Sequence, residues 1–219
     1  MDKIIDKMKI KILVLGMVST NCYIVSNIET KEAIIIDPAD RAEVIKESME
    51  AEGLKVVGIL LTHGHFDHIM AASDLASSYN LKVYANKEEK DLLADPNQNC
   101  SADVGKNVSL LLENNLSDGE MLTLAGFLIK AIHTPGHTAG GTCYYFVNHG
   151  ILISGDTLFL ESIGRCDLPT GNIIKLKESI KSKLLLLDED TVVYPGHGDT
   201  TTIGYEKRNN PYLNEEDLW

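Results

Sequence analysis

The sequence predicts a mixed α/β (α+β) fold, and three observations support this prediction. Short apolar runs with the length or alternation of β-strands recur along the chain. Segments with helical start and stop signals separate several of these runs. The chain has 219 residues, of which 44% are hydrophobic and 24% charged, and no low-complexity segment or linker interrupts it. This length and composition predict one globular domain over residues 1–219, with a substantial core.

Ten segments have the pattern of strands. Apolar and β-branched residues dominate them, and turn-forming residues bound many of them. The predicted strands are residues 9–15, 22–26, 33–36, 56–61, 82–85, 121–124, 127–132, 142–147, 151–154 and 191–194, the last of the series. The turn Asn148-His149-Gly150 is expected to join two of them as a hairpin.

Helical segments follow several of these strands. A capping box of Asp40 and Glu43 predicts one helix start, and Gly53 predicts its end. Residues 69–79 have apolar side chains at helical spacing. Asn172 is the expected N-terminal cap of a helix that runs to about residue 187.

Residues 86–119 form the least regular part of the prediction. A short helix is expected up to residue 94. Residues 95–119 have mixed polarity and no clear period, so we expect an ordered excursion with one helical turn.

Charge and composition exclude several partners. The formal net charge is −12 and the isoelectric point is about 5.0. Nucleic-acid binding usually needs a basic stripe, so none is expected. The apolar run at residues 12–18 is too short to span a bilayer, and charged residues spoil a secretory signal. We therefore predict a cytoplasmic protein that acts on a small molecule; the sequence leaves its oligomeric state open.

Histidine and aspartate concentrate in motifs that suit metal ions. Five of the seven histidines lie in them. Four candidate ligands fall within six residues of the segment His63-Gly64-His65-Phe66-Asp67-His68, a density that no packing requirement explains. Three more follow in order along the chain. These are His137, Asp156 and His197, and a glycine directly precedes each.

These seven residues predict a centre for two divalent ions. His63, His65 and His137 are expected to hold one ion, and Asp67, His68 and His197 the other. Asp156 is expected to bridge both. Imidazole and carboxylate are ligands for zinc, iron and manganese, and zinc is our first expectation. Two such ions roughly 3.5–4 Å apart form a hydrolytic centre, so Asp67 and Asp156 are the candidate catalytic carboxylates.

Together these motifs resemble the metallo-β-lactamase-fold hydrolases, and in particular the glyoxalase II-like (hydroxyacylglutathione hydrolase-like) members. Further agreeing segments are Ile36-Asp37-Pro38, Ile132-His133-Thr134-Pro135-Gly136-His137-Thr138, Ser154-Gly155-Asp156-Thr157-Leu158-Phe159, Ile163-Gly164-Arg165-Cys166-Asp167-Leu168-Pro169 and Thr202-Ile203-Gly204-Tyr205-Glu206-Lys207. The similarity runs from about residue 10 to 212. It implies a four-layer αββα sandwich with the metal centre at one edge. The additional C-terminal helical domain of full glyoxalase II proteins is not expected here.

Residues around the centre have two readings each. Asp37 ends a buried strand and is expected either to hold a metal-bound histidine or to serve only as a helix-entry residue. In the resembled family, the segment at 158–167 lies beside the substrate. Phe159 and Arg165 are therefore candidate substrate contacts, although Arg165 can instead pair with Asp167. Residues 95–119 are expected to supply the other wall.

Hydrolysis of a small thioester by a metal-bridged hydroxide is the primary prediction. A thiol with a pKa of about 8.5 leaves without strong acid catalysis, which suits a site with no evident acid besides Asp67. The alternative is a persulfide dioxygenase with one iron on His63, His137 and Asp156. A lactonase or an inactive metal-binding protein are further alternatives. Phe159 stands where lactonases of this fold often have tyrosine. The β-lactamases of this fold often carry a cysteine as a metal ligand, whereas this chain has the carboxylate of Asp156.

Overall fold

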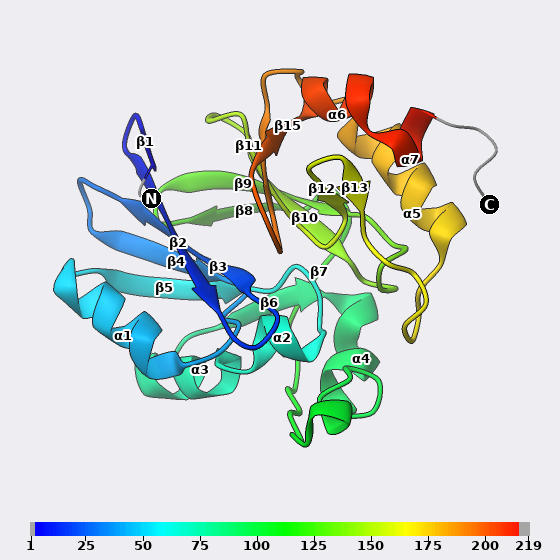
Figure 1. The fold of residues 1–219 in the computed structure, drawn as a ribbon. Coiled ribbons are helices and arrows are strands. Elements are labelled where there is room, and N and C mark those ends of the chain that lie inside the picture. Colours follow the sequence, from blue (N-terminus) through cyan, green and yellow to red (C-terminus); the bar gives the residue numbers. More distant parts are fainter. Residues whose placement is uncertain (1–2, 215–219) are drawn as a thin grey trace.

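Two β-sheets face each other, and helices cover the outer face of each (Figure 1). The structure is a computed structural model that describes residues 3–214. Within this range the first sheet has seven strands, in the spatial order β1 (Lys3–Ile5), β2 (Met8–Leu15), β3 (Thr20–Asn27), β4 (Glu32–Ile36), β5 (Lys55–Leu60), β6 (Val83–Asn86) and β7 (Asn114–Leu116). Strands β4 to β7 run parallel, and the others pair antiparallel.

The second sheet has six strands in the described part of the chain. Their spatial order is β15 (Thr201–Thr202), β14 (Val192–Pro195), β11 (Ile151–Gly155), β10 (Thr142–Phe146), β9 (Phe127–His133) and β8 (Met121–Leu124). Strand β10 pairs antiparallel with β9 and β11, and β14 runs parallel to β11. Strands β9, β11 and β14 therefore all end at the same edge. A small hairpin of β12 (Leu158–Phe159) and β13 (Ser162–Ile163) follows β11.

Helices pack on the two outer faces. On the first sheet these are α1 (Ala42–Ala51) and α3 (Ala72–Tyr79), and on the second α5 (Ile173–Ser179), α6 (Ile203–Asn209) and α7 (Pro211–Asn214) (Figure 1). Two short helices, α2 (Phe66–Ile69) and α4 (Lys90–Ala94), lie near the sheet edge. The irregular turns are 3₁₀ at Lys87–Glu89 and Ala102–Val104, and π at Ile180–Leu184. Among residues 3–214, no helix has the length and apolar character needed to cross a membrane.

Side-chain alternation along the strands produces three apolar cores between the four layers. In β4, Ile35 packs toward the helices of the first sheet, whereas Ile34 and Ile36 point between the sheets. In the second sheet, Leu152 of β11 points outward and packs in the core that includes Leu176 of α5. Because strand side chains alternate between faces, each sheet can bury both sides. The mixed α/β class and the αββα order are confirmed.

Some predicted boundaries are wrong. No capping box forms between Asp40 and Glu43: the Asp40 carboxylate accepts from the Arg41 backbone N–H, and α1 begins at Ala42 without a side-chain cap. The helix predicted over 69–79 begins only at Ala72, as α3, and Ile69 is instead the last residue of α2. The helix is interrupted between α2 and α3, because the backbone N–H of Ala71 donates to the Pro38 carbonyl.

The other differences concern the excursion and the end of the chain. The excursion contains its one helical turn, but it also supplies β7, which the sequence did not indicate. The segment at 191–194 is not the last strand, since β15 and two helices follow it. Asn172 does cap α5, by accepting from the Lys175 backbone N–H.

Candidate metal centre

The candidate ligands lie where strands of both sheets end. His63 follows β5 of the first sheet, and His137, Asp156 and His197 follow β9, β11 and β14 of the second. Strands that run in the same direction deliver their following residues to one edge, so the seven predicted residues meet there. Their ligand atoms form a first group, of His63, His65 and His137, and a second group, of Asp67, His68 and His197. A further set of closely spaced atoms, on His63, His68 and Asp156, overlaps both groups.

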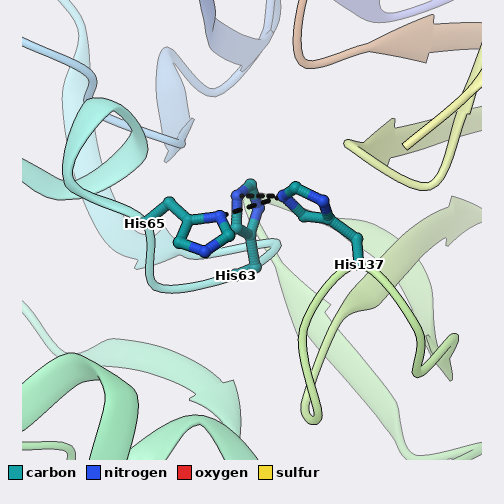
Figure 2. A group of neighbouring side chains, drawn as sticks. All are labelled: His63, His65 and His137. Atoms are coloured by element: carbon teal, nitrogen blue, oxygen red, sulfur yellow. Dashed lines mark hydrogen bonds between the residues drawn. The ribbon is translucent and has the colours of Figure 1, made fainter. Parts of the chain in front are cut away.

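The first group consists of three converging imidazoles. Figure 2 shows the rings of His63, His65 and His137 turned toward one another. His137 Nε2 lies 2.9 Å from His65 Nδ1 and 3.2 Å from His63 Nε2. Two nitrogens bound to one tetrahedral ion at about 2.0–2.1 Å lie about 3.3 Å apart, so this spacing fits a shared ion.

The second group joins two imidazoles and a carboxylate. Asp67 Oδ2 lies 3.4 Å from His68 Nε2 and 3.3 Å from His197 Nε2. The His197 side chain is 29% exposed, whereas that of His68 is fully buried. Solvent therefore reaches the centre from the side of His197.

Asp156 stands between the two groups. Its Oδ1 atom lies 3.4 Å from His68 Nε2 in the second group. Its Oδ2 atom lies 3.6 Å from His137 Nε2 in the first group and 3.5 Å from His197 Nε2 in the second. This is the position expected of a bridging carboxylate.

Two buried polar atoms without hydrogen-bond partners among the described residues indicate that this site suits a metal ion. His68 Nε2 and Asp156 Oδ1 are buried and have no hydrogen-bond partner among residues 3–214, although buried polar atoms normally have one. A cation between them would satisfy both atoms. The donor set of imidazole and carboxylate also fits zinc or iron, and the residues therefore fit the predicted pair of ions.

The pKa shifts of the histidines differ between the first and the second group. Burial lowers the pKa of His63 well below its usual value and that of His65 to about 3, so both imidazoles stay neutral, as metal ligands must be. Burial alone would also lower the pKa of His68, but the Asp67 and Asp156 carboxylates raise it well above normal. Burial would raise the pKa of Asp67, yet His68 and hydrogen bonds from His197 and Thr20 lower it to about 2. The Asp67 and Asp156 carboxylates thus attract positive charge, which a bound ion would supply in place of the proton on His68.

Two side chains outside the ligand set orient it. Asp37 is fully buried at the end of β4, and its Oδ2 lies 2.9 Å from His68 Nδ1. It also accepts from the Thr62 backbone N–H and hydroxyl, at 2.7 and 2.6 Å. Asp37 therefore lies where it can hold His68, as one of its two readings expected. Thr20 was not foreseen: its hydroxyl donates to Asp67 Oδ2 at 2.7 Å.

Replacing Asp37 with asparagine is expected to weaken the second metal position by about 10- to 100-fold. The amide would donate toward His68 Nδ1, which would then keep its proton on Nε2, the atom that faces Asp67 and Asp156. Asparagine tolerates the left-handed backbone of residue 37 (φ 50°), so the fold should persist. Competition with a chelator measures the loss. The exposed Asp74→Asn on α3 is the matched control, and equal affinity in both variants would contradict the role of Asp37.

A cavity of about 310 Å³ opens over the centre. Cys100 from the excursion lines it together with Phe159 and Arg165. The structure thus brings residues from both predicted wall segments to the centre. Arg165 also forms a bidentate pair with Asp167, with both N–O distances at 2.7 Å, and its backbone carbonyl lies 2.8 Å from His137 Nδ1. The pairing with Asp167 is therefore present, and Arg165 also lines the cavity, whereas its contact with a substrate stays a prediction.

A metal-binding edge between two facing sheets defines the class of α/β protein to which this chain belongs. Residues 15–197 match the family described as the metallo-beta-lactamase superfamily. The chain belongs to this superfamily, whose members are mostly hydrolases, and the resemblance seen in the sequence is confirmed.

Named relatives cover almost the whole chain. The hydroxyacylglutathione hydrolase GloC of Haemophilus influenzae is 36% identical over 95% of this chain and 100% of its own length. The crystal structure of the BLEG-1 B3 metallo-beta-lactamase is 39% identical, with a TM-score of 0.90, over 94% of this chain and 100% of that one. The structure of TTHA1623 in a di-iron-bound form is 34% identical, with a TM-score of 0.82, over 93% of this chain and 100% of that one.

Proposed function

We propose that the protein is a dinuclear metal-dependent hydrolase that cleaves small thioesters. The observation that carries this proposal is the position of Asp156, whose carboxylate lies within 3.4–3.6 Å of His137 in the first group and of His68 and His197 in the second. A bridging carboxylate is useful only where two ions are held. The similarity to GloC, which is named a hydroxyacylglutathione hydrolase, supports a thioester as substrate.

His63, His65 and His137 would hold one ion, and Asp67, His68 and His197 the other. When bound, two divalent ions would supply a water of lowered pKa and a Lewis acid for the carbonyl of the substrate. Asp67, held by Thr20, has a pKa of about 2 and is ionised at neutral pH, so it accepts rather than donates a proton. A thiolate leaves without an added proton, which fits a site with an ionised Asp67.

The cavity walls give the substrate its place. Phe159 offers an apolar surface beside His197, with 6.3 Å between the ring centres. Arg165 offers a cation at the cavity rim for a carboxylate on the substrate. We propose both as substrate contacts. Replacing Arg165 with alanine should raise KM for carboxylate-bearing thioesters more than for neutral ones.

A substrate panel tests the proposed activity. The purified protein, loaded with zinc or with iron, should hydrolyse S-lactoylglutathione or smaller thioesters and consume no oxygen with a persulfide. GloC has about the same length as this chain, so a glutathione thioester is the first to try. We predict weak binding and a high KM for this thioester. Oxygen uptake with a persulfide, and one iron per chain, would instead favour the dioxygenase.

A second candidate activity is hydrolysis of a β-lactam. BLEG-1 is named a B3 metallo-beta-lactamase, and it is 39% identical to this chain. A chromogenic cephalosporin belongs in the panel, and turnover faster than that of every thioester would reverse our order of preference.

Metal identity and location are finer proposals. Zinc is our first expectation, and the di-iron form of TTHA1623 supports iron as the next one to test. We propose a cytoplasmic location, and the free thiols of Cys22, Cys100, Cys143 and Cys166 are compatible with it. Elemental analysis of protein purified from cells decides the metal.

A further inference from the structure

A buried carboxylate that the mechanism does not use lies between the two loops that carry the first ligand group. Glu89 follows β6, is fully buried, and contacts both loops. Its Oε2 accepts from the backbone N–H of Gly64, between His63 and His65, at 3.1 Å. Its Oε1 accepts from the Thr138 hydroxyl, next to His137, and from the Gly140 N–H at 2.7 Å.

The surrounding chain is built for this close approach. A Cβ atom on Gly140 would lie 2.5 Å from the Glu89 backbone nitrogen and 2.6 Å from its Cγ. A Cβ on Gly64 would lie 2.7 Å from Leu92 Cδ2, on the helix that follows Glu89. Real Cβ atoms do not come so near. Glycine at these two positions therefore allows the loop that carries His63 and His65 and the loop that carries His137 to pack directly against the Glu89 segment.

Burial of this carboxylate carries a cost that the contacts offset in part. Burial raises the pKa of Glu89 to about 7, although the Thr138, Gly140 and Gly64 donors oppose the rise. A buried polar group is tolerated when its hydrogen bonds are made, and here they link segments 25 to 51 residues apart along the chain.

We propose that Glu89 is a positioning residue that fixes the separation of the His63–His65 loop from the His137 loop, and thereby sets the affinity of the first metal position. The inference rests on the proposed metal centre. It assigns to Glu89 in the first group the part that Asp37 plays for His68 in the second. Outer partners of metal ligands typically account for about 10- to 100-fold in metal affinity.

Glu206 provides a matched control. It is also fully buried and also accepts three hydrogen bonds, from Thr201 Oγ1 at 2.5 Å, Asn210 Nδ2 at 2.8 Å and the Glu161 N–H at 3.0 Å. None of these partners adjoins a candidate ligand. A purely structural role of a buried glutamate should therefore appear equally in both residues.

The test compares Glu89→Gln, Glu206→Gln and the wild type. In either orientation of the glutamine amide, its NH2 group would face a backbone N–H, of Gly64 or of Gly140, so one of the two loops must move. Competition for Zn²⁺ with a chromophoric chelator should show about 10- to 100-fold weaker binding at one position in Glu89→Gln and unchanged binding in Glu206→Gln. Thermal unfolding of the metal-free forms measures the structural effect separately. Equal loss of stability with unchanged Zn²⁺ affinity in both variants would overturn the proposal.

A milder pair covers the case in which Glu89→Gln does not fold. Thr138→Val removes one donor to Glu89, and Thr138→Ser retains it. Weaker Zn²⁺ binding in Thr138→Val, with recovery in Thr138→Ser, supports the proposal; equal affinity in both refutes it. If the wild type itself binds no Zn²⁺, iron or manganese, the proposed metal centre fails, which is a different result from an unaffected Glu89 variant.

Discussion

Replacing Asp156 with alanine is expected to weaken both metal positions and to reduce turnover at least about 100-fold. Loss of a partner one step removed from a metal costs about 10- to 100-fold, so loss of a ligand shared by two ions costs no less. The change removes the oxygens that lie 3.4 Å from His68 Nε2 and 3.6 Å from His137 Nε2. The metal content, measured by elemental analysis, and the rate of thioester hydrolysis should fall together.

The exposed Asp190→Ala controls for the loss of a carboxylate elsewhere. A protein that keeps both ions after loss of Asp156 would rule out the bridge. A wild type with one tightly bound ion, and with Asp67 and His68 unligated, would count against the hydrolase and favour the dioxygenase.

Replacing Gly196 with alanine should disturb the metal centre although none of the seven candidate ligands is itself substituted. The added Cβ would lie 2.1 Å from Asp156 Oδ1 and 2.8 Å from His68 Cε1. The backbone cannot easily yield, because Gly196 N–H donates to Gly155 O at 2.8 Å and Gly196 O accepts from Asn21 N–H at 2.7 Å. The Asp156 carboxylate must therefore move. A displacement of about 1 Å in a catalytic site can cost about 100-fold in rate.

Gly58→Ala is the matched control for this substitution. A Cβ there would come no nearer than 3.4 Å to another residue, at Tyr84 Cε2, which is ordinary contact. Metal content and turnover should remain normal in that variant and fall in Gly196→Ala. Full activity in Gly196→Ala would mean that Asp156 is not confined as the structure has it.

The ligands were predictable because their signal is local. Four of them crowd into the segment at 63–68, and each of the others follows a glycine at the end of an apolar strand. Asp37 was predictable for a related reason, as an acid directly after a buried strand. The fold class followed from the same pattern of short apolar runs, and the layer order from the family resemblance. That residues 1–219 form one domain stays a prediction.

Glu89 and Thr20 were missed because their partners are remote in sequence. Thr20 meets Asp67 across 47 residues, and Glu89 meets Gly140 across 51. One signal could have revealed Glu89. Strands β4, β5 and β6 are parallel neighbours, so the acid shortly after β6 lies at the same edge as Asp37 and His63. Sequence alone does not fix which strands are neighbours.

The helix errors have a physical cause as well. A polar side chain near a helix start has several nearby backbone donors to choose from. Asp40 bonds to the next residue instead of reaching into the first turn. The break before α3 depends on Pro38, more than 30 residues earlier in the chain. Strand β15 is only two residues long, too short for a pattern to appear.

The ligands of each group come from both halves of the sandwich, and this has a consequence for the whole molecule. An ion bound there acts as a removable cross-link, because His63 belongs to one sheet's edge and His137 to the other's. A ligand present at 100 times its dissociation constant stabilises the folded state by about 2.7 kcal/mol. The melting temperature should therefore rise with the concentration of free metal. Removal of the metal should weaken the contact between the two sheets as well as abolish the proposed activity.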